Sequence, residues 1–324
     1  MNANSASAPL DPHDLAAAVA RVLDIDAASL RLSRCRTGKF NTTWFVDGAD
    51  EPLVLRVAPS DDPEPLLFYE YRMMRQEPGI HERLLRETRV PVPAIRAVVQ
   101  DDPDLDRDFL VMERLPGVPL SERGFGSAQV NRLMASVGEC LKQAHALEGP
   151  AYGYVGPHQP MEPQADWSAA FRIMWDKLLT DTERCGGYTS DEACTMRRLL
   201  DTHAAVFERK VPKALLHMDV WAQNILADET GQLTGLLDWD RALYGDPEIE
   251  FAVLDYCGIS TPAFWEGYGD LRDESSEARL RHAFYYLYEL QKYILIRRLR
   301  SGSAAAAEGY RREALRLAKT LMGS

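Results

Sequence analysis

The segment 217–238 contains several side chains that can bind a metal ion or accept a proton. Four of them are His217, Asp219, Asn224 and Asp238. A carboxamide and a carboxylate that converge make an all-oxygen ligand set, which suits Mg²⁺ because this hard cation binds one or two carboxylates together with substrate phosphates. If Asn224 and Asp238 hold the cation, Asp219 is left to face a substrate hydroxyl. These residues therefore predict metal-assisted chemistry on a phosphate-bearing substrate.

Short strands are expected to hold these residues in place. One apolar run ends at His217, a second begins at Ile225, and a third ends at Asp238. The turn at 228–232 would join the second and third runs into a hairpin, which brings Asn224 and Asp238 to the same rim. The segment 213–240 is therefore predicted to fold as strand, loop, strand, turn, strand.

The first third of the chain is predicted to form a small antiparallel sheet. Alternating or β-branched runs are separated there by Gly, Asp and Pro, which is typical of a meander. A helix over 15–23 precedes the sheet, and a second helix over 63–76 is expected to end at Pro78-Gly79. The predicted strands are 30–35, 42–47, 52–57, 94–99 and 109–112.

The rest of the chain is predicted to be mainly helical. The stretch 113–119 contains two prolines and a glycine, and we place the boundary between two lobes there. The prediction is an α+β fold with an N-terminal lobe 1–112, a hinge 113–118 and a helical C-terminal lobe 119–324. Helical periodicity supports helices over 127–147, 166–184, 190–208, 277–300 and 304–321.

Length and charge exclude several classes of protein. Among 324 residues, 49 are acidic and 37 basic, giving a net charge of -12. This balance disfavours nucleic acid and anionic membranes as partners and mildly favours a cationic small molecule, although acidity is also common for solubility alone. No apolar run is long enough to cross a bilayer. The five cysteines are widely spaced and the N-terminus does not resemble a signal peptide, so a cytoplasmic location is expected.

The order of the motifs resembles a known family. His-x-Asp-x4-Asn at 217–224 is followed by Asp-Trp-Asp at 238–240 and by Tyr-Gly-Asp-Pro-Glu at 244–248. This pattern is similar to that of the aminoglycoside phosphotransferase and choline kinase-like family, whose members are small-molecule kinases. The resemblance extends from Leu30 to the C-terminal helices. It implies a protein-kinase-like two-lobe fold.

The resemblance also implies a role for each residue of the motif. Asp219 matches the catalytic aspartate, which accepts a hydrogen bond from the acceptor hydroxyl. Asn224 and Asp238 match the Mg²⁺ ligands. His217 matches a residue that braces the loop. Met218 departs from the glycine common at that position, where a side chain is either tolerated or crowds the acceptor pocket.

Residues upstream match the phosphate-binding parts of the family in the same order. Arg56 corresponds to the basic residue of the third strand, which grips phosphate oxygens, and Glu70 to the acidic partner that holds it in place. The turn between the first two strands would cover the triphosphate of ATP or GTP through backbone amides near Gly38 and the hydroxyls of Thr37 and Thr42. Its single glycine is a weak signal without the other motifs.

The resemblance places adenine against the strand that ends at the hinge. Backbone groups near Glu113 and Leu115 would bind the edge of the base, and Val54 would contact its face. Taken together, these matches predict an ATP- or GTP-dependent phosphotransferase that uses Mg²⁺.

Several other features have structural interpretations. Asp240 is left open as a metal ligand, and Asp246 is expected to cap the following helix and to bond back to the catalytic loop. His145 is predicted to be a core histidine. The aromatic stripe Trp167, Phe171 and Trp175 is predicted to face the core, and the basic run 297–300 to be a solvated helix end.

The acceptor is the least determined part. Its pocket is expected between the catalytic loop and the helices over 166–208, with the C-terminal helices contributing. Carboxylates there would suit an aminoglycoside. The candidates are Asp166, Asp176, Asp181, Glu183, Glu266 and Asp270.

Other functions stay open. The alternative acceptors are macrolides, nucleoside or peptide antibiotics, homoserine-like amino acids, sugars and choline-like alcohols. A nucleotide-binding pseudokinase and a nucleotidyl transferase are alternatives to a kinase. The sequence does not distinguish a monomer from a homodimer.

Overall fold

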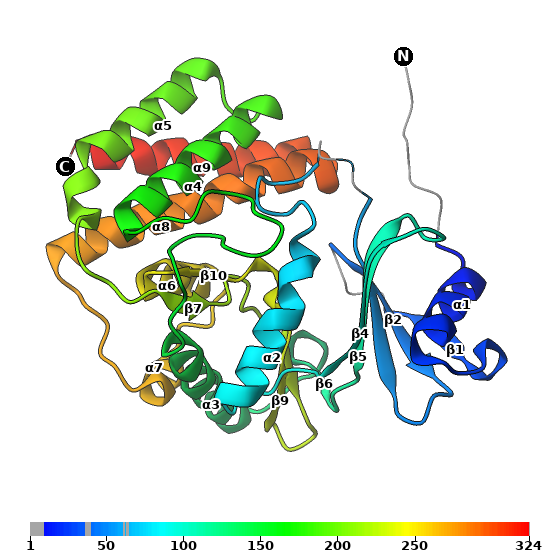
Figure 1. Cartoon of the computed structure of the whole chain (residues 1–324). Coiled ribbons are helices and arrows are strands. Elements are labelled where there is room, and N and C mark those ends of the chain that lie inside the picture. The colour runs from blue at the N-terminus through cyan, green and yellow to red at the C-terminus, as the bar shows by residue number, and fades with distance from the viewer. Residues whose placement is uncertain (1–9, 36–39, 61, 63–64, 324) are drawn as a thin grey trace, which may run out of the picture.

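The N-terminal third of the chain forms an antiparallel sheet. A computed structural model describes residues 10–35, 40–60, 62 and 65–323. Within them the sheet has the strand order β1-β2-β3-β5-β4, so β3 is central and is bonded to a neighbour on each side (Figure 1). The strands are β1 (Arg31–Arg34), β2 (Thr42–Asp47), β3 (Leu53–Val57), β4 (Ile95–Asp102) and β5 (Arg107–Glu113).

Two small sheets lie within the second part of the chain. In one, β6 pairs with β8, and β8 pairs with β9; in the other, β7 pairs with β10. All pairs are antiparallel. The strands are β6 (Val118–Pro119), β7 (Ala214–Leu216), β8 (Ile225–Ala227), β9 (Leu233–Leu236) and β10 (Leu243–Gly245).

Helices make up most of the rest. The first two are α1 (Pro12–Leu23) and α2 (Glu77–Glu87). The others are α3 (Ser127–His145), α4 (Trp167–Arg184), α5 (Ser190–Thr202), α6 (Pro247–Tyr256), α7 (Pro262–Tyr268), α8 (Ser276–Leu295) and α9 (Ala304–Met322). Among the described residues, none of these helices combines the length and the apolar character needed to cross a bilayer.

The predicted strands and most of the predicted helices are present, but the helix expected over 63–76 is not. The described part of that segment contains turns and one short 3-10 turn, Met73–Gln76. The α-helix α2 begins at Glu77, just before Pro78-Gly79, where the prediction ended the helix. Proline is well placed in the first turn of a helix, because the backbone N–H that it lacks has no partner there.

Two other helices end earlier than predicted. The helix expected over 190–208 ends at Thr202 and continues as a 3-10 turn, Ala204–Phe207. The helix expected over 277–300 changes after Leu295 into a single π-helical turn, Ile296–Arg300. Ile296, Arg297 and Arg300 of that turn line the large cleft of the molecule.

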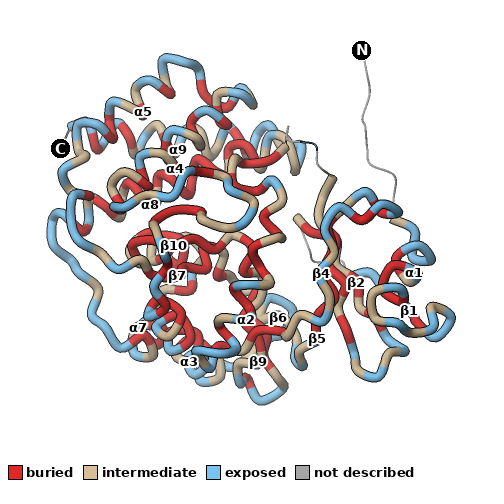
Figure 2. The backbone as a smooth tube through the Cα atoms, viewed as in Figure 1, coloured by how far each residue is buried: buried red, intermediate tan, exposed pale blue. Residues whose placement is uncertain are grey.

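Buried residues form separate clusters in the two parts of the molecule (Figure 2). One cluster joins α1 to the N-terminal sheet. Ile80 and Leu84 of α2, however, belong to the same cluster as Leu133 and Val137 of α3. The helix α2 therefore packs with the helical part, although it precedes β4 and β5 in the sequence.

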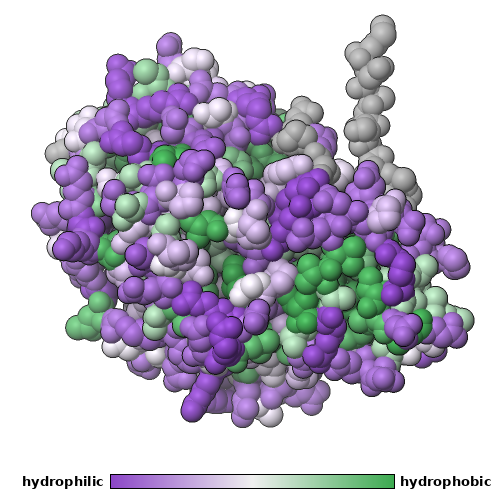
Figure 3. All heavy atoms as spheres, in the orientation of Figure 1, coloured by the Kyte–Doolittle hydropathy of each residue, from purple (hydrophilic) through white to green (hydrophobic). Residues whose placement is uncertain are grey.

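Surface polarity also differs between the two parts. On the face shown in Figure 3, hydrophobic side chains gather over the N-terminal sheet, whereas the helical part presents mostly hydrophilic side chains. The aromatic stripe of α4 is buried, as predicted, because Trp167, Phe171 and Trp175 are each about 1% exposed.

Candidate active site

A cleft of about 880 Å³ opens between the N-terminal sheet and the helical part. Its walls come from β2, β3 and the end of β5, from the segment 115–122, from the loop between β7 and β8, and from the C-terminal ends of α6 and α8. Asp219, Asn224 and Asp238 all line this cleft, together with Arg56. The segment 213–240 thus folds as predicted and delivers its polar residues to one place.

His217 fixes the loop that carries Asp219. Its side chain is buried, and its Nε2 atom lies 2.9 Å from the carbonyl oxygen of Leu237. Its Nδ1 atom accepts a hydrogen bond from the backbone N–H of Asp219 at 3.2 Å. One imidazole therefore bonds both to the loop and to the segment that follows β9, which is the bracing role that the family resemblance implies.

Met218 adopts a left-handed backbone conformation, with φ of 65°. A glycine would take this conformation without strain, which gives a physical reason for the family preference. The Met218 side chain is 1% exposed and packs in the core, and it does not line the cleft. It therefore does not crowd the acceptor. Its N–H donates to Glu250 Oε1 at 2.6 Å.

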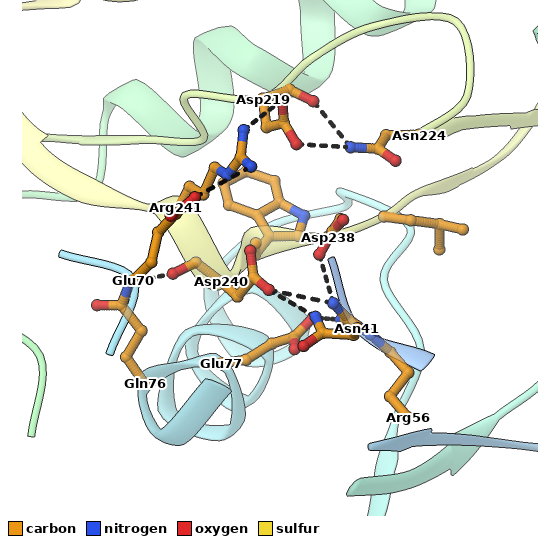
Figure 4. A network of polar contacts seen from close by, with 12 residues as sticks. Asn41, Arg56, Glu70, Gln76, Glu77, Asp219, Asn224, Asp238, Asp240 and Arg241 are labelled. Carbon is orange, nitrogen blue, oxygen red and sulfur yellow. Dashed lines mark hydrogen bonds and ion pairs between the residues drawn. The ribbon is translucent and has the colours of Figure 1, made fainter. Parts of the chain in front are cut away.

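Asn224 lies beside Asp219 (Figure 4). Its Nδ2 atom donates to the backbone oxygen of Asp219 at 2.9 Å and lies 3.4 Å from its carboxylate Oδ2. Within the described residues, the amide oxygen of Asn224 accepts no hydrogen bond. This oxygen is therefore available to a ligand in the cleft.

Asp238 follows β9 in a left-handed conformation with φ of 70°. Its Oδ1 atom bonds to Arg56 Nη2, and its Oδ2 atom has no partner among the described residues. Its side chain is 31% exposed, the most open of the cluster. One free carboxylate oxygen and one free amide oxygen in the same cleft fit Mg²⁺, which completes its coordination with water and phosphate.

No larger metal site exists in the part of the chain that the structure describes. No group of three or more His, Cys, Asp or Glu side chains there is arranged to hold an ion. The pair of Asn224 and Asp238 consists of one amide and one carboxylate, so it is a smaller site of a different kind.

Arg56 is held by Glu77, and not by Glu70 as predicted. Its guanidinium bonds to the Glu77 carboxylate and to Asp238, and lies 3.2 Å from Asp240 (Figure 4). Burial opposes the ionised form of Glu77, but Arg56 and the nearby His81 outweigh it and hold the pKa of Glu77 below its ordinary value. The correction follows from the helix boundary: because α2 begins at Glu77, this residue faces β3.

Asp240 lies behind Arg56 and does not line the cleft. It is 2% exposed and accepts a hydrogen bond from Asn41 Nδ2 at 2.8 Å. Burial and the neighbouring Asp238 raise its pKa, and Arg56 opposes that rise. This position favours a structural role over metal binding for the residue that the sequence left open.

Glu70 belongs to a different network from the one predicted. It lies 3.4 Å from Arg241 and bonds to Arg300 Nη2 through both carboxylate oxygens, at 3.0 and 2.8 Å. Arg241 in turn lies 3.3 Å from Asp219 Oδ1. The basic run 297–300 is therefore not a fully solvated helix end, because the Arg300 side chain is only 17% exposed.

Two other structural expectations have clear outcomes. His145 is a core histidine as predicted, bonded to Tyr268 at 2.8 Å and to Glu250 at 2.6 Å. Asp246 caps α6 as predicted, accepting from the N–H of Glu248. The bond back to the catalytic loop, however, comes from Glu250, because this residue lies one helical turn further along and faces Met218.

The predicted nucleotide residues are divided between the cleft and other places. Val54, Glu113 and Leu115 line the cleft, whereas Thr42 does not and its neighbour Thr43 does. The expected turn residues Thr37 and Gly38 lie outside the described residues.

None of the six carboxylates proposed for the acceptor pocket lines the cleft. Asp176 and Glu183 both pair with Arg197, and Asp270 pairs with Lys142. Asp166 caps α4, and Asp181 accepts from the backbone N–H of Phe68. The C-terminal helices contribute instead the residues Tyr256, Cys257, Tyr293, Ile296, Arg297 and Arg300.

Solved structures of small-molecule kinases share this fold. A fructosamine-3-kinase candidate from Haemophilus somnus superposes with a TM-score of 0.69 at 15% identity, over 95% of this chain and 96% of that one. A thermostable mutant of aminoglycoside phosphotransferase APH(4)-Ia, solved with AMP-PNP and hygromycin B, gives 0.63 at 18% identity, over 89% and 95%. These likenesses confirm the predicted α+β, protein-kinase-like fold with a sheet-bearing and a helical part.

The family follows from the sequence comparison. A model of APH, the phosphotransferase enzyme family, matches residues 31–285, so the chain belongs to this family, as predicted. A curated relative, acyl-CoA dehydrogenase family member 10 of Mus musculus, is 23% identical over 247 residues. That match takes in 72% of this chain but only 21% of the relative, so the chain spans about a fifth of the length of that protein.

Proposed function

We propose that this chain is a small-molecule kinase that transfers the γ-phosphoryl group of ATP or GTP to a hydroxyl. The observation that carries the proposal is the meeting of Asp219, Asn224, Asp238 and Arg56 in one cleft. Phosphoryl transfer needs little covalent chemistry from a protein. It needs the phosphates, the metal ion and the hydroxyl to be positioned and their charges to be balanced.

Asp219 is the residue assigned to the acceptor. Its carboxylate would accept a hydrogen bond from the substrate hydroxyl and take its proton as the new bond forms. Arg241 at 3.3 Å and the bond from the loop backbone to His217 would keep the carboxylate oriented. Asp219 is 17% exposed, so it is accessible from the cleft and still constrained.

The phosphates are assigned to the opposite side of the same space. Asn224 and Asp238 would hold Mg²⁺ through their free oxygens, and the ion would supply the positive charge that neutralises the phosphates. Arg56 would bind the phosphates that are not transferred, with Glu77 fixing the guanidinium. Thr37 and Gly38 stay part of the proposal as residues of the turn expected to cover the triphosphate, whereas Thr42, the first residue of β2, does not line the cleft and is not retained.

The base of the nucleotide is assigned to the segment after β5. Among the described residues, the N–H of Glu113 is bonded to Ala94 and that of Arg114 to Pro52, whereas the N–H of Leu115 has no partner. The free donor at Leu115 suits a ring nitrogen of a purine. Val54, with Phe45 and Met112, supplies an apolar wall for the ring. The division into lobes at the hinge 113–118 goes with this proposal.

The acceptor is proposed to be a small hydroxyl compound, and aminoglycosides are one candidate class. The proposed reaction requires the ATP and Mg²⁺ of the cytoplasm. The choice among acceptor classes depends on the part of the cleft wall that the ends of α6 and α8 form.

The variant Asp219→Asn tests the proposed function. We expect ADP formation from Mg·ATP, with pooled hydroxyl compounds as acceptors, to fall by about 100-fold or more, because a positioned base contributes about 10²–10⁴-fold to such steps. The affinity for Mg·AMP-PNP, measured by calorimetry, should change by less than about two-fold, because the metal ligands stay in place.

The control is Glu229→Gln, which alters an exposed carboxylate outside the cleft. It should keep the full rate of ADP formation. A wild-type rate for Asp219→Asn, or no measurable binding of Mg·AMP-PNP by the unmodified protein, would contradict the proposal.

A further inference from the structure

The part of the cleft beyond Asp219 has a wall with an unusual set of side chains. The end of α6 supplies Tyr256 and Cys257, and the end of α8 with the π-helical turn supplies Tyr293, Arg297 and Arg300. Arg300 of this wall bonds to Glu70, Glu70 lies 3.4 Å from Arg241, and Arg241 lies 3.3 Å from Asp219 Oδ1. This wall is therefore next to the proposed catalytic carboxylate.

This wall carries one positive charge that no carboxylate of the described residues balances, that of Arg297. Arg241 is balanced by Asp219 and Glu70, and Arg300 is balanced by the same Glu70. Arg297 has no carboxylate partner within the described part of the chain. The ends of α6 and α8 add no carboxylate to the cleft, so Asp219 is the only acidic side chain among the described residues in this part of it.

The position of Arg297 is fixed by aromatic rings. Its guanidinium lies 5.7 Å from the ring centre of Tyr293 and 6.0 Å from that of Tyr310. These two rings stack at 5.2 Å, and Tyr293 also stacks on Tyr256 at 4.9 Å. A guanidinium held against rings keeps its N–H groups free for a ligand, and its planar fork matches a carboxylate or phosphate.

We infer that the acceptor of this enzyme is a hydroxyl compound that also carries an anionic group, a carboxylate or a phosphate, which binds Arg297 while its hydroxyl faces Asp219. This inference rests on the proposed function and adds the substrate class. An aminoglycoside fits the wall poorly, because its ammonium groups would meet the Arg297 guanidinium, which has no carboxylate partner among the described residues. The aromatic rings leave room for an apolar or planar body between the two polar ends.

The test uses three matched probes that share a hydroxymethyl-substituted benzene ring. The para substituent is a carboxylate, a carboxamide or an aminomethyl group. Binding of each is measured by calorimetry or ligand-observed NMR with Mg·AMP-PNP present, so that the nucleotide part of the cleft is filled. We expect the carboxylate to bind about ten-fold more tightly than the other two, because bonds between ions are about twice as strong as neutral ones.

Variants connect this preference to one side chain. Arg297→Ala should remove the preference for the carboxylate, Arg297→Lys should restore part of it, and Arg297→Glu should shift it to the aminomethyl probe. Arg298→Ala is the matched control, because Arg298 is the next residue, is exposed and does not line the cleft. It should behave as the unmodified protein.

Failure of this inference and failure of the proposed function give different results. If Mg·AMP-PNP binds but the aminomethyl or carboxamide probe binds as tightly as the carboxylate, or if none of the three binds, the anionic acceptor is wrong and the kinase proposal stands. If Arg297→Ala weakens Mg·AMP-PNP binding, Arg297 contacts the nucleotide and the inference is equally wrong. If Mg·AMP-PNP itself does not bind, the proposed function fails.

Discussion

At the scale of the residue, the site depends on carboxylates whose partners differ from those that the sequence suggests. Glu77 and Glu70 are both almost fully buried, yet each belongs to its own network. Glu77 holds Arg56, which is proposed to bind the nucleotide phosphates, and Glu70 joins Arg241 to Arg300 in the part of the cleft proposed for the acceptor. Because a buried ion pair is costly to break from one side, the two acids should have separable effects.

The pair of variants Glu77→Gln and Glu70→Gln tests this separation. Glu77→Gln should weaken Mg·AMP-PNP binding by about ten-fold or more, because Arg56 loses a charge-assisted bond that contributes about 1.5–3 kcal/mol. Glu70→Gln should leave that affinity within about two-fold and lower only the acceptor-dependent rate. Calorimetry and ADP release measure the two effects. Equal losses of nucleotide affinity in both variants would show that the networks are one.

At the scale of the element, short strands and caps position the site. The sequence predicted most of these elements. The hairpin around 228–232 and the bracing His217 follow from local patterns, because neighbouring residues decide a turn and the ends of a strand. The start of α2 did not follow. Pro78-Gly79 is compatible with the end of a helix and with its first turn, and the burial of Ile80 and Leu84 in the cluster that also contains Leu133 and Val137 decides between them.

The cap of α6 allows a quantitative prediction for an element. Asp246 accepts from the N–H of Glu248 and also bonds to Arg209 and Tyr285. Asp246→Ala should lower the free energy of unfolding by about 1–2 kcal/mol from the lost cap alone. Asp246→Asn keeps a capping oxygen and should lose less. Urea denaturation at neutral pH measures both variants, and equal losses would mean that the cap contributes nothing.

At the scale of the whole molecule, the cleft wall formed by the ends of α6 and α8 could not be predicted from the sequence. Arg297 and Arg300 are about 80 residues beyond Asp219 in the chain, and no local pattern distinguishes them from a solvated helix end. The same holds for the six carboxylates proposed for the pocket, of which Asp176, Glu183 and Asp270 pair with basic residues of α5 and α3. Motifs with fixed spacing can be recognised in a sequence. Which residues form the opposite wall of a cleft, in contrast, depends on tertiary packing.

The stability of the whole molecule should depend on pH through ion pairs outside the cleft. Asp255 bonds to His282 and Arg272, each at 2.7 Å. Burial acts to raise the pKa of Asp255, but these two partners outweigh it and hold the pKa well below its usual range. A lowered pKa in the folded state stabilises the protein above the unfolded pKa of about 4, and this stabilisation is lost as the pH falls.

The variant Asp255→Asn should therefore be less stable than the unmodified protein at neutral pH. The difference should shrink progressively as the pH falls from about 4 toward the lowered pKa of the folded state, because the unfolded carboxylate is protonated first and the folded one only below its own pKa. Thermal unfolding followed across this range measures the difference. A difference that stays constant with pH would mean that the charge of Asp255 does not contribute.

The bond between Arg56 and Asp238 has a consequence for nucleotide binding. In the structure, the cation proposed for the phosphates and the anion proposed for the metal neutralise each other across the interface between β3 and the end of β9. A nucleotide that arrives with its metal would exchange this internal pair for two external ones, phosphate with Arg56 and metal with Asp238. A nucleotide without its metal would compete with Asp238 for Arg56 and would leave the Asp238 carboxylate unpaired beside a negatively charged phosphate. The bond between Arg56 and Asp238 would therefore disfavour binding of the metal-free nucleotide.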